Sequence, residues 1–167
     1  MGQKRCELRE AFIEDHRRLT RGFSELLRAI QLNDLAAAHR AATELDQRAG
    51  PHIRFEESVL YPKVAESRGA DFVRRLYEEH RIGADVLRRI LAHGPTGALT
   101  LEQQSELARQ AQTALDHAVS CGALLSHITT LDEAAQAEML RILRRFQKDK
   151  QCWTEFAGNA APENATK

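Results

Sequence analysis

Four histidines and one glutamate stand out because their spacing places each of them on the inward side of an expected helix. His52 and Glu56 are four residues apart in the stretch GPHIRFEESVLYP (residues 50–62), so their side chains lie one turn apart on one helix face. Such a pair is either a local polar contact at the surface or two ligands of a metal site. Three other stretches have apolar residues at helical spacing, and in each a histidine takes an inward position. These histidines are His16, His80 and His117.

Buried imidazoles at one level of a helical core need partners for their nitrogens. The chain has seven histidines, and about two of them should fall on inward positions by chance. Each of these four lies well inside its helix, so antiparallel packing brings them to a similar depth. A single histidine of this kind is more often a core residue bonded to a neighbour. Four of them together with Glu56 favour a metal site, because a metal supplies a partner for each imidazole.

Cys121 follows His117 by four residues, at the distance where a carboxylate would form a second histidine–carboxylate pair. It is a metal ligand, which would favour a softer metal such as zinc, or a thiol beside a redox centre, or a small buried apolar residue. Glu57 and Glu79 flank two of the expected ligands. We predict that both face solvent, with the orientation of a histidine as the alternative role.

The periodicity of apolar residues predicts the elements that carry these side chains. It indicates long helices over about 4–31, 35–62, 71–92 and 101–128, and a shorter fifth helix opened by TLDE at residues 130–133. The alternation of three and four continues through Gly50 and Pro51, so we expect one long helix kinked at Pro51. Together these patterns predict an all-α fold, an up-down-up-down antiparallel four-helix bundle with an additional C-terminal helix.

Length and composition predict one domain and limit its partners. We expect the bundle to cover residues 1–150, followed by a polar tail over residues 151–167 that is partly disordered. The formal net charge is +0 without a basic block, which argues against nucleic acid as a partner. We find neither a transmembrane run nor a secretory signal, so no membrane association is expected.

The cysteines and the C-terminal aromatic residues give two further expectations. Cys6, Cys121 and Cys152 are odd in number and far apart, so they form no disulfide framework and favour a cytoplasmic location. Phe146, at the end of the fifth helix, and the aromatic residues after it could cover a homodimer interface. Those later residues are Trp153 and Phe156.

The segments EDHRRL, PHIRFEESVLYP, EEHRIG and DHAVSCGALL together resemble the hemerythrin-like (HHE) family over about residues 8–145. The resemblance implies a four-helix bundle that holds two irons, ligated by histidines and bridged by two carboxylates. It implies that Glu56 is a bridging carboxylate, and it implies four histidine ligands: His16, His52, His80 and His117. Imidazole and carboxylate together suit iron, so the chemistry of these residues agrees independently.

The chain departs from the pattern of that family at two places. Many members carry a second histidine on the third helix, four residues from the first, where this chain has Leu76 and Ala84. Cys121 stands where the family has its second bridging carboxylate. We therefore include Cys121 among the candidate ligands and expect the second metal to be held weakly.

These features predict a protein with one or two non-haem iron ions that binds or senses O2, NO or peroxide, or handles iron. We find no nucleophile–base pair and no phosphate-binding loop, so a dedicated enzyme is not expected. A peroxidase-like or oxidase-like side activity stays open. The alternative is a zinc-bound or metal-free helical bundle that acts as an interaction module.

Overall fold

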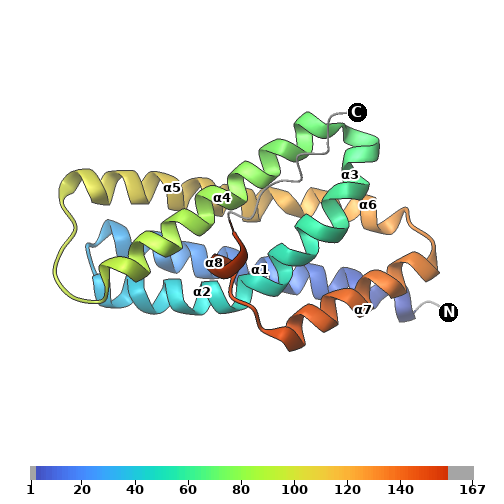
Figure 1. Cartoon of the computed structure of the whole chain (residues 1–167), viewed down its shortest axis with the longest axis horizontal. Coiled ribbons are helices and arrows are strands. Elements are labelled where there is room, and N and C mark those ends of the chain that lie inside the picture. Colours follow the sequence, from blue (N-terminus) through green and yellow to red (C-terminus); the bar gives the residue numbers. More distant parts are fainter. Residues whose placement is uncertain (1–2, 158–167) are drawn as a thin grey trace.

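The computed structural model describes residues 3–157, with side chains from residue 7 onward, and helices are the only regular elements in that range (Figure 1). The predicted all-α class is therefore confirmed for these residues. The elements, in chain order, are α1 (Gln3–Gln31), α2 (Leu35–Phe55), the π-helix η1 (Glu56–Leu60), α3 (Tyr61–Arg68), α4 (Ala70–His93), α5 (Leu101–Ser120), the 3-10 helix η2 (Cys121–Leu124), α6 (Leu125–Thr129), α7 (Glu133–Asp149) and α8 (Trp153–Phe156).

Four long helices enclose the interior of the molecule (Figure 1). Helix α1 packs against α2 and α5, and α4 packs against the same two helices, so the four surround a shared core. Helix α7 packs against α1 and α2, and α3 packs against α4. Two apolar clusters fill the core, one around Phe23 and one around Phe12. His16 lies between these two residues along α1, and so the histidines form a polar layer between the clusters.

The inward positions predicted from periodicity are buried with few exceptions. On α1 the apolar members are 5% exposed or less, and they are Phe12, Leu19, Phe23, Leu26 and Ile30. Thr100 and Gln103 form a capping box at the start of α5. The predicted fifth helix is α7, and its N-cap is Asp132, within the stretch TLDE. The apolar pattern therefore predicts where the helices lie and which face is buried.

The kink at Pro51 stays a prediction, and the irregular turn of this helix lies beyond it. Helix α2 remains α-helical through Pro51 to Phe55, and the irregular turn is η1, which begins at Glu56. There the amide of Tyr61 donates to the carbonyl of Glu56, five residues earlier, as in a π-helix. The wider turn brings Tyr61 into the core, whereas Val59, expected to face inward, is only partly buried.

The first residues of the predicted tail (151–167) lie against the bundle. Residues 151–157, called here the C-terminal segment, contain α8, which packs against α2 and α4. Trp153 is 2% exposed and belongs to the apolar cluster around Phe23. Trp153 and Phe146 are both buried within their own chain. Residues 158–167, and with them the predicted disorder, lie outside the described residues.

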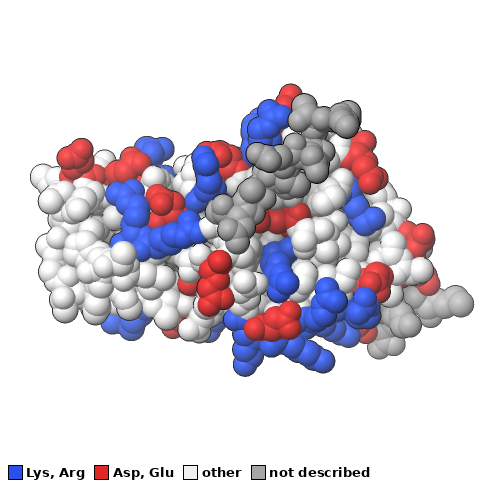
Figure 2. Space-filling view, in the orientation of Figure 1, with Lys and Arg blue, Asp and Glu red and all other residues white. Residues whose placement is uncertain are grey.

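Charged side chains of both signs are interspersed over the face of the molecule seen in Figure 2. This mixture agrees with the formal net charge of +0 for the whole chain. Among residues 3–157, no helix is long and apolar enough to cross a membrane.

Candidate metal centre

Glu56 lies in the middle of the polar layer, and its side chain is 1% exposed. One carboxylate oxygen, Oε1, lies 3.4 Å from Nε2 of His52 and 3.6 Å from Nε2 of His16. The other, Oε2, lies 3.2 Å from Nε2 of His80. The rings of His80 and His117 are neighbours, with centroids 4.7 Å apart. The carboxylate thus stands between two pairs of histidines, as a carboxylate that bridges two metal ions does.

The second ring nitrogen, Nδ1, of each of these histidines is held by an oxygen atom. The pairs are His16 with the Phe12 carbonyl at 2.8 Å, His52 with Asp15 at 3.3 Å, His80 with Glu57 at 2.9 Å and His117 with Glu79 at 2.6 Å. An acceptor at Nδ1 places the proton there and leaves the lone pair of Nε2 available to a metal. All four rings are therefore oriented in the way that metal-ligating histidines usually are.

Two of these inward nitrogens have no hydrogen-bond partner among the described residues. They are Nε2 of His52 and Nε2 of His117, on side chains that are at most 8% exposed. A buried polar atom without a partner costs about 1–3 kcal/mol. A metal ion beside each nitrogen would supply the missing partner, so the donor set fits a metal centre.

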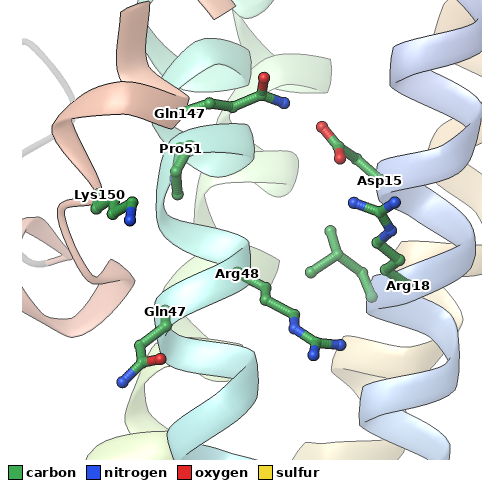
Figure 3. Close-up of a pocket in the computed structure, with 8 residues that line it drawn as sticks. Asp15, Arg18, Gln47, Arg48, Pro51, Gln147 and Lys150 are labelled. Atoms are coloured by element: carbon green, nitrogen blue, oxygen red, sulfur yellow. The ribbon is translucent and has the colours of Figure 1, made fainter. Parts of the chain in front are cut away.

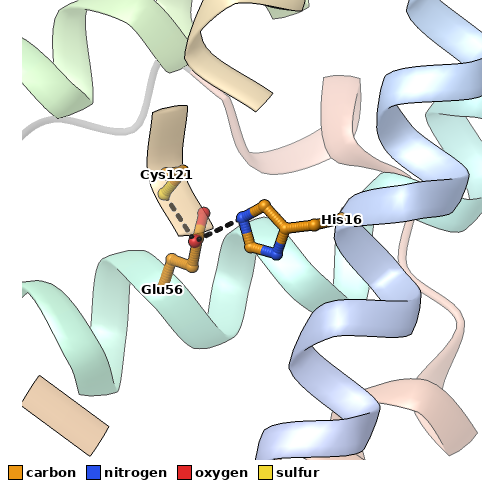
Figure 4. A group of neighbouring side chains, drawn as sticks. All are labelled: His16, Glu56 and Cys121. Carbon is orange, nitrogen blue, oxygen red and sulfur yellow. Dashed lines mark hydrogen bonds and ion pairs between the residues drawn. The ribbon is translucent and has the colours of Figure 1, made fainter. Parts of the chain in front are cut away.

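Cys121, the first residue of η2, places its thiol beside the same carboxylate (Figure 4). Its Sγ lies 3.1 Å from Oε1 of Glu56. Donor atoms of His16, Glu56 and Cys121 all lie within 4.8 Å of one another, and so do those of Glu56, His80 and His117. Burial and the nearby Glu56 carboxylate raise the pKa of the Cys121 thiol well above its ordinary value. The thiol therefore keeps its proton when no metal is bound, and it donates a hydrogen bond to Glu56.

Tyr61 belongs to the site, although it was not among the predicted site residues. Its hydroxyl lies 2.9 Å from Nε2 of His80 and 3.4 Å from Oε2 of Glu56. Burial and the Glu56 carboxylate raise the pKa of Tyr61 well above its ordinary value. The signal for this role in the sequence was that an aromatic residue stands directly before Pro62. The π-turn of η1 directs its side chain inward, and the sequence did not show this turn.

The charges of the site are coupled through Glu56. Burial alone would lower the pKa of His52, but the carboxylates of Glu56 and Asp15 raise it to about 9. Burial would raise the pKa of Glu56, yet the histidines around it, His52 first, hold it well below its ordinary value. Burial and the neighbouring His52 lower the pKa of His16 to about 4. The metal-free site therefore holds an ion pair between protonated His52 and the Glu56 carboxylate. A bound cation would replace the proton on His52.

Two hollows approach the site from outside. One offers about 600 Å³ and is lined by Asp15, Arg18, Arg48 and Lys150 (Figure 3), of which Asp15 contacts the candidate ligand His52. A second hollow of about 510 Å³ lies between α1 and the α5–η2 segment and is bordered by His16. The second hollow therefore gives a small molecule the more direct approach to a candidate ligand.

The structure brings all six predicted site residues together, with the carboxylate of Glu56 at the centre. They are His16, His52, Glu56, His80, His117 and Cys121. Glu57 and Glu79 are partly exposed, as predicted, but each also accepts a hydrogen bond from a histidine of another helix, which is the alternative role. Periodicity along a single helix could not show this contact.

The model of the hemerythrin HHE cation-binding domain matches residues 7–134 of the chain. This range contains all six predicted site residues and ends just inside α7. No curated protein and no solved structure shows a significant match.

Proposed function

We propose that this chain, which belongs to the family of hemerythrin HHE cation-binding domains, is a non-haem iron protein. Its metal centre would bind or sense O2, NO or peroxide. One observation carries the proposal: the carboxylate of Glu56 lies between two pairs of histidines. Two of the histidine nitrogens that face it have no hydrogen-bond partner among the described residues. Imidazole and carboxylate are a donor set that suits ferrous and ferric iron. The same donors would serve a protein that handles iron.

A centre of two ions would use both sides of the Glu56 carboxylate. His16 and His52 would hold one ion together with Oε1, and His80 and His117 would hold the other together with Oε2. Iron with an open coordination position supplies the capacity to bind a small molecule reversibly. The chain orients the imidazoles through their Nδ1 atoms and shields them from water, since none of the four is more than 8% exposed.

The proposal includes two features of the whole chain. We take the four long helices to run alternately up and down, which brings the four histidines to one level. We also place the protein in the cytoplasm, because Cys121 and Cys152 are both free thiols and a reducing compartment preserves them.

The thiol of Cys121 favours a second candidate function. Thiolate and imidazole together are a typical donor set for zinc. In that case a structural zinc ion would hold the helices together, and the bundle would act as an interaction module.

Metal analysis of the purified protein, combined with an absorption spectrum, separates these functions. Bound iron with charge-transfer bands in the near ultraviolet supports the iron centre. Zinc alone supports the interaction module. A protein that holds no metal after anaerobic reconstitution with ferrous iron would overturn the iron centre.

A further inference from the structure

We infer that the C-terminal segment (residues 151–157) completes a ligand cavity at the metal centre and that Trp153 selects and positions the small molecule bound there. The segment lies outside residues 7–134, the range matched by the family model. The inference rests on the proposed iron centre and narrows its ligand to a molecule of one to three heavy atoms.

A small enclosed cavity lies directly beside the candidate ligands. It offers about 10 Å³ to the centre of a water-sized molecule, which is about the space that a single water molecule needs. His16, Glu56, His80 and His117 line it on the metal side, and Trp153 contributes to the remaining wall. An organic substrate does not fit this space, which leaves room only for a ligand of a few atoms with one end held by the metal ion.

Trp153 carries an N–H group, and it lines a wall that also contains Glu79 beside apolar residues. Its side chain is 2% exposed, and its Nε1 has no hydrogen-bond partner among the described residues. A buried tryptophan N–H usually finds an acceptor. The indole ring also lies against the His80 ring, with centroids 6.0 Å apart. A ligand in the cavity with a partly negative atom would be the acceptor that the protein itself does not provide.

The bundle is shaped to receive the C-terminal segment. The carboxylate of Asp46, which is 7% exposed, accepts hydrogen bonds from the amide and the hydroxyl of Thr154, both at 2.7 Å. A Cβ atom on Gly50 would lie 1.9 Å from a carbonyl oxygen of the segment. A Cβ atom on Gly83 would lie 2.6 Å from the indole ring of Trp153. Glycine is a poor helix former, so its presence in two helices at these contacts supports a specific seat for the segment.

Azide, a small anion that binds iron, is the probe for the variant Trp153→Phe. This variant keeps an aromatic wall and removes the N–H group. We expect it to hold as much iron as the wild type but to bind azide with a dissociation constant about three- to tenfold higher, the effect of losing one hydrogen bond. The control is Phe156→Leu, because Phe156 lies in the same segment but does not line the cavity. Its azide affinity should equal that of the wild type.

A second measurement does not depend on any variant or on activity. Trp153 is the single tryptophan of the chain, so its fluorescence reports on the cavity. We expect emission typical of a buried indole in the metal-free protein, loss of emission on titration with ferrous iron, and a further change when azide is added.

The outcomes separate this inference from the function on which it rests. Full iron content with unchanged azide affinity in Trp153→Phe would overturn the inference and leave the iron centre intact. An equal loss of affinity in Phe156→Leu would also overturn it, because the effect would then come from loosening the segment. Emission that does not respond to bound iron would do the same. A wild-type protein without iron would overturn the proposed function, and the inference with it.

Discussion

Neighbouring residues in the sequence serve two different helices at this site. Three adjacent pairs combine a candidate ligand with a carboxylate that holds a histidine of another helix, and these pairs are Asp15–His16, Glu56–Glu57 and Glu79–His80. Adjacent residues on an α-helix point about 100° apart, so one of them can face the centre while the other reaches the next helix. An acidic residue beside a candidate ligand is therefore a signal for such a contact, although it does not identify the histidine.

Replacing a candidate ligand should remove the metal and leave the fold in place. We expect His52→Ala to lose most of its bound iron, because a ligand and the ion pair with Glu56 disappear together. The helices should persist, because buried apolar residues supply most of their stability. Metal analysis and far-ultraviolet circular dichroism check both points. His93→Ala is the control, since His93 is exposed at the end of α4. Equal iron content in wild type and His52→Ala would exclude His52 as a ligand.

Glu79 allows a test of whether the carboxylates around the histidines support metal binding. Its Oε2 lies 2.6 Å from Nδ1 of His117, and such outer partners commonly change metal affinity about 10–100-fold. We expect Glu79→Ala to weaken iron binding by that factor in a competition assay with a chelator. Glu78→Ala is the matched control, because Glu78 pairs with the exposed Arg81. Identical affinities for the two variants would mean that Glu79 serves the surface, as the sequence had suggested.

Cys121 decides how strongly a second ion is held. Two metal ions that lie close together repel each other, and bridging anions offset that repulsion. With the protonated thiol of Cys121 beside Glu56, we expect the wild type to bind closer to one iron than two. Cys121→Glu should raise the iron content and lower the melting temperature of the metal-free protein, because two buried carboxylates would then face each other.

Iron stoichiometry after anaerobic reconstitution, together with thermal melting of the metal-free proteins, measures both effects. Cys121→Ser, which keeps the size of the side chain, is the control and should leave stoichiometry near that of the wild type. Two irons in the wild type, unchanged in Cys121→Glu, would show that another group bridges the ions.

At the scale of the elements, the two irregular turns begin at candidate site residues, η1 at Glu56 and η2 at Cys121. The sequence predicted the helices around them because apolar periodicity follows burial. It could not predict the turns, since Val59 and Leu60 are both apolar and the pattern fits either one inside. In a regular α-helix Tyr61 would point about 140° away from Glu56. The residue pattern alone therefore does not decide the turn.

The C-terminal segment was missed for a different reason. Its neighbours in the sequence are small and polar, so composition assigned the whole stretch after residue 150 to a tail. The signals lay elsewhere in the chain, in a glycine at position 50 within a helix and in the buried carboxylate of Asp46. Both make sense only once the segment is seen to lie across α2.

Gly50→Ala should displace the C-terminal segment from its seat. The new Cβ would lie 1.9 Å from a backbone oxygen, which cannot rotate away as a side chain could. Overpacking of this kind costs about 1–3 kcal/mol, so we expect a lower melting temperature and Trp153 emission at longer wavelength. Gly122→Ala is the matched control, because its Cβ meets nothing within 4 Å. Unchanged emission in Gly50→Ala would mean that the segment does not dock there in solution.

At the scale of the whole molecule, the polar layer separates the two apolar clusters that stabilise the bundle. The candidate ligands come from α1, from the continuous α2–η1 segment, from α4 and from the α5–η2 segment. A metal centre would therefore connect all four long helices at mid-height. Without it, the layer keeps a buried His52–Glu56 ion pair and, in Nε2 of His117, an imidazole nitrogen that has no hydrogen-bond partner among the described residues, so the metal-free protein should be the less stable form.

Removal of the metal should accordingly lower the melting temperature of the protein. A ligand at about 1,000 times its dissociation constant stabilises the native state by about 4 kcal/mol, which corresponds to roughly 8–16 °C for a chain of this size. Thermal melting of iron-loaded protein before and after treatment with a chelator measures the shift. His52→Ala should show almost no shift, because it starts with little metal. If the wild type melts at the same temperature in both states while its iron is removed, the centre does not connect the helices, and packing of the two apolar clusters alone sets the stability of the bundle.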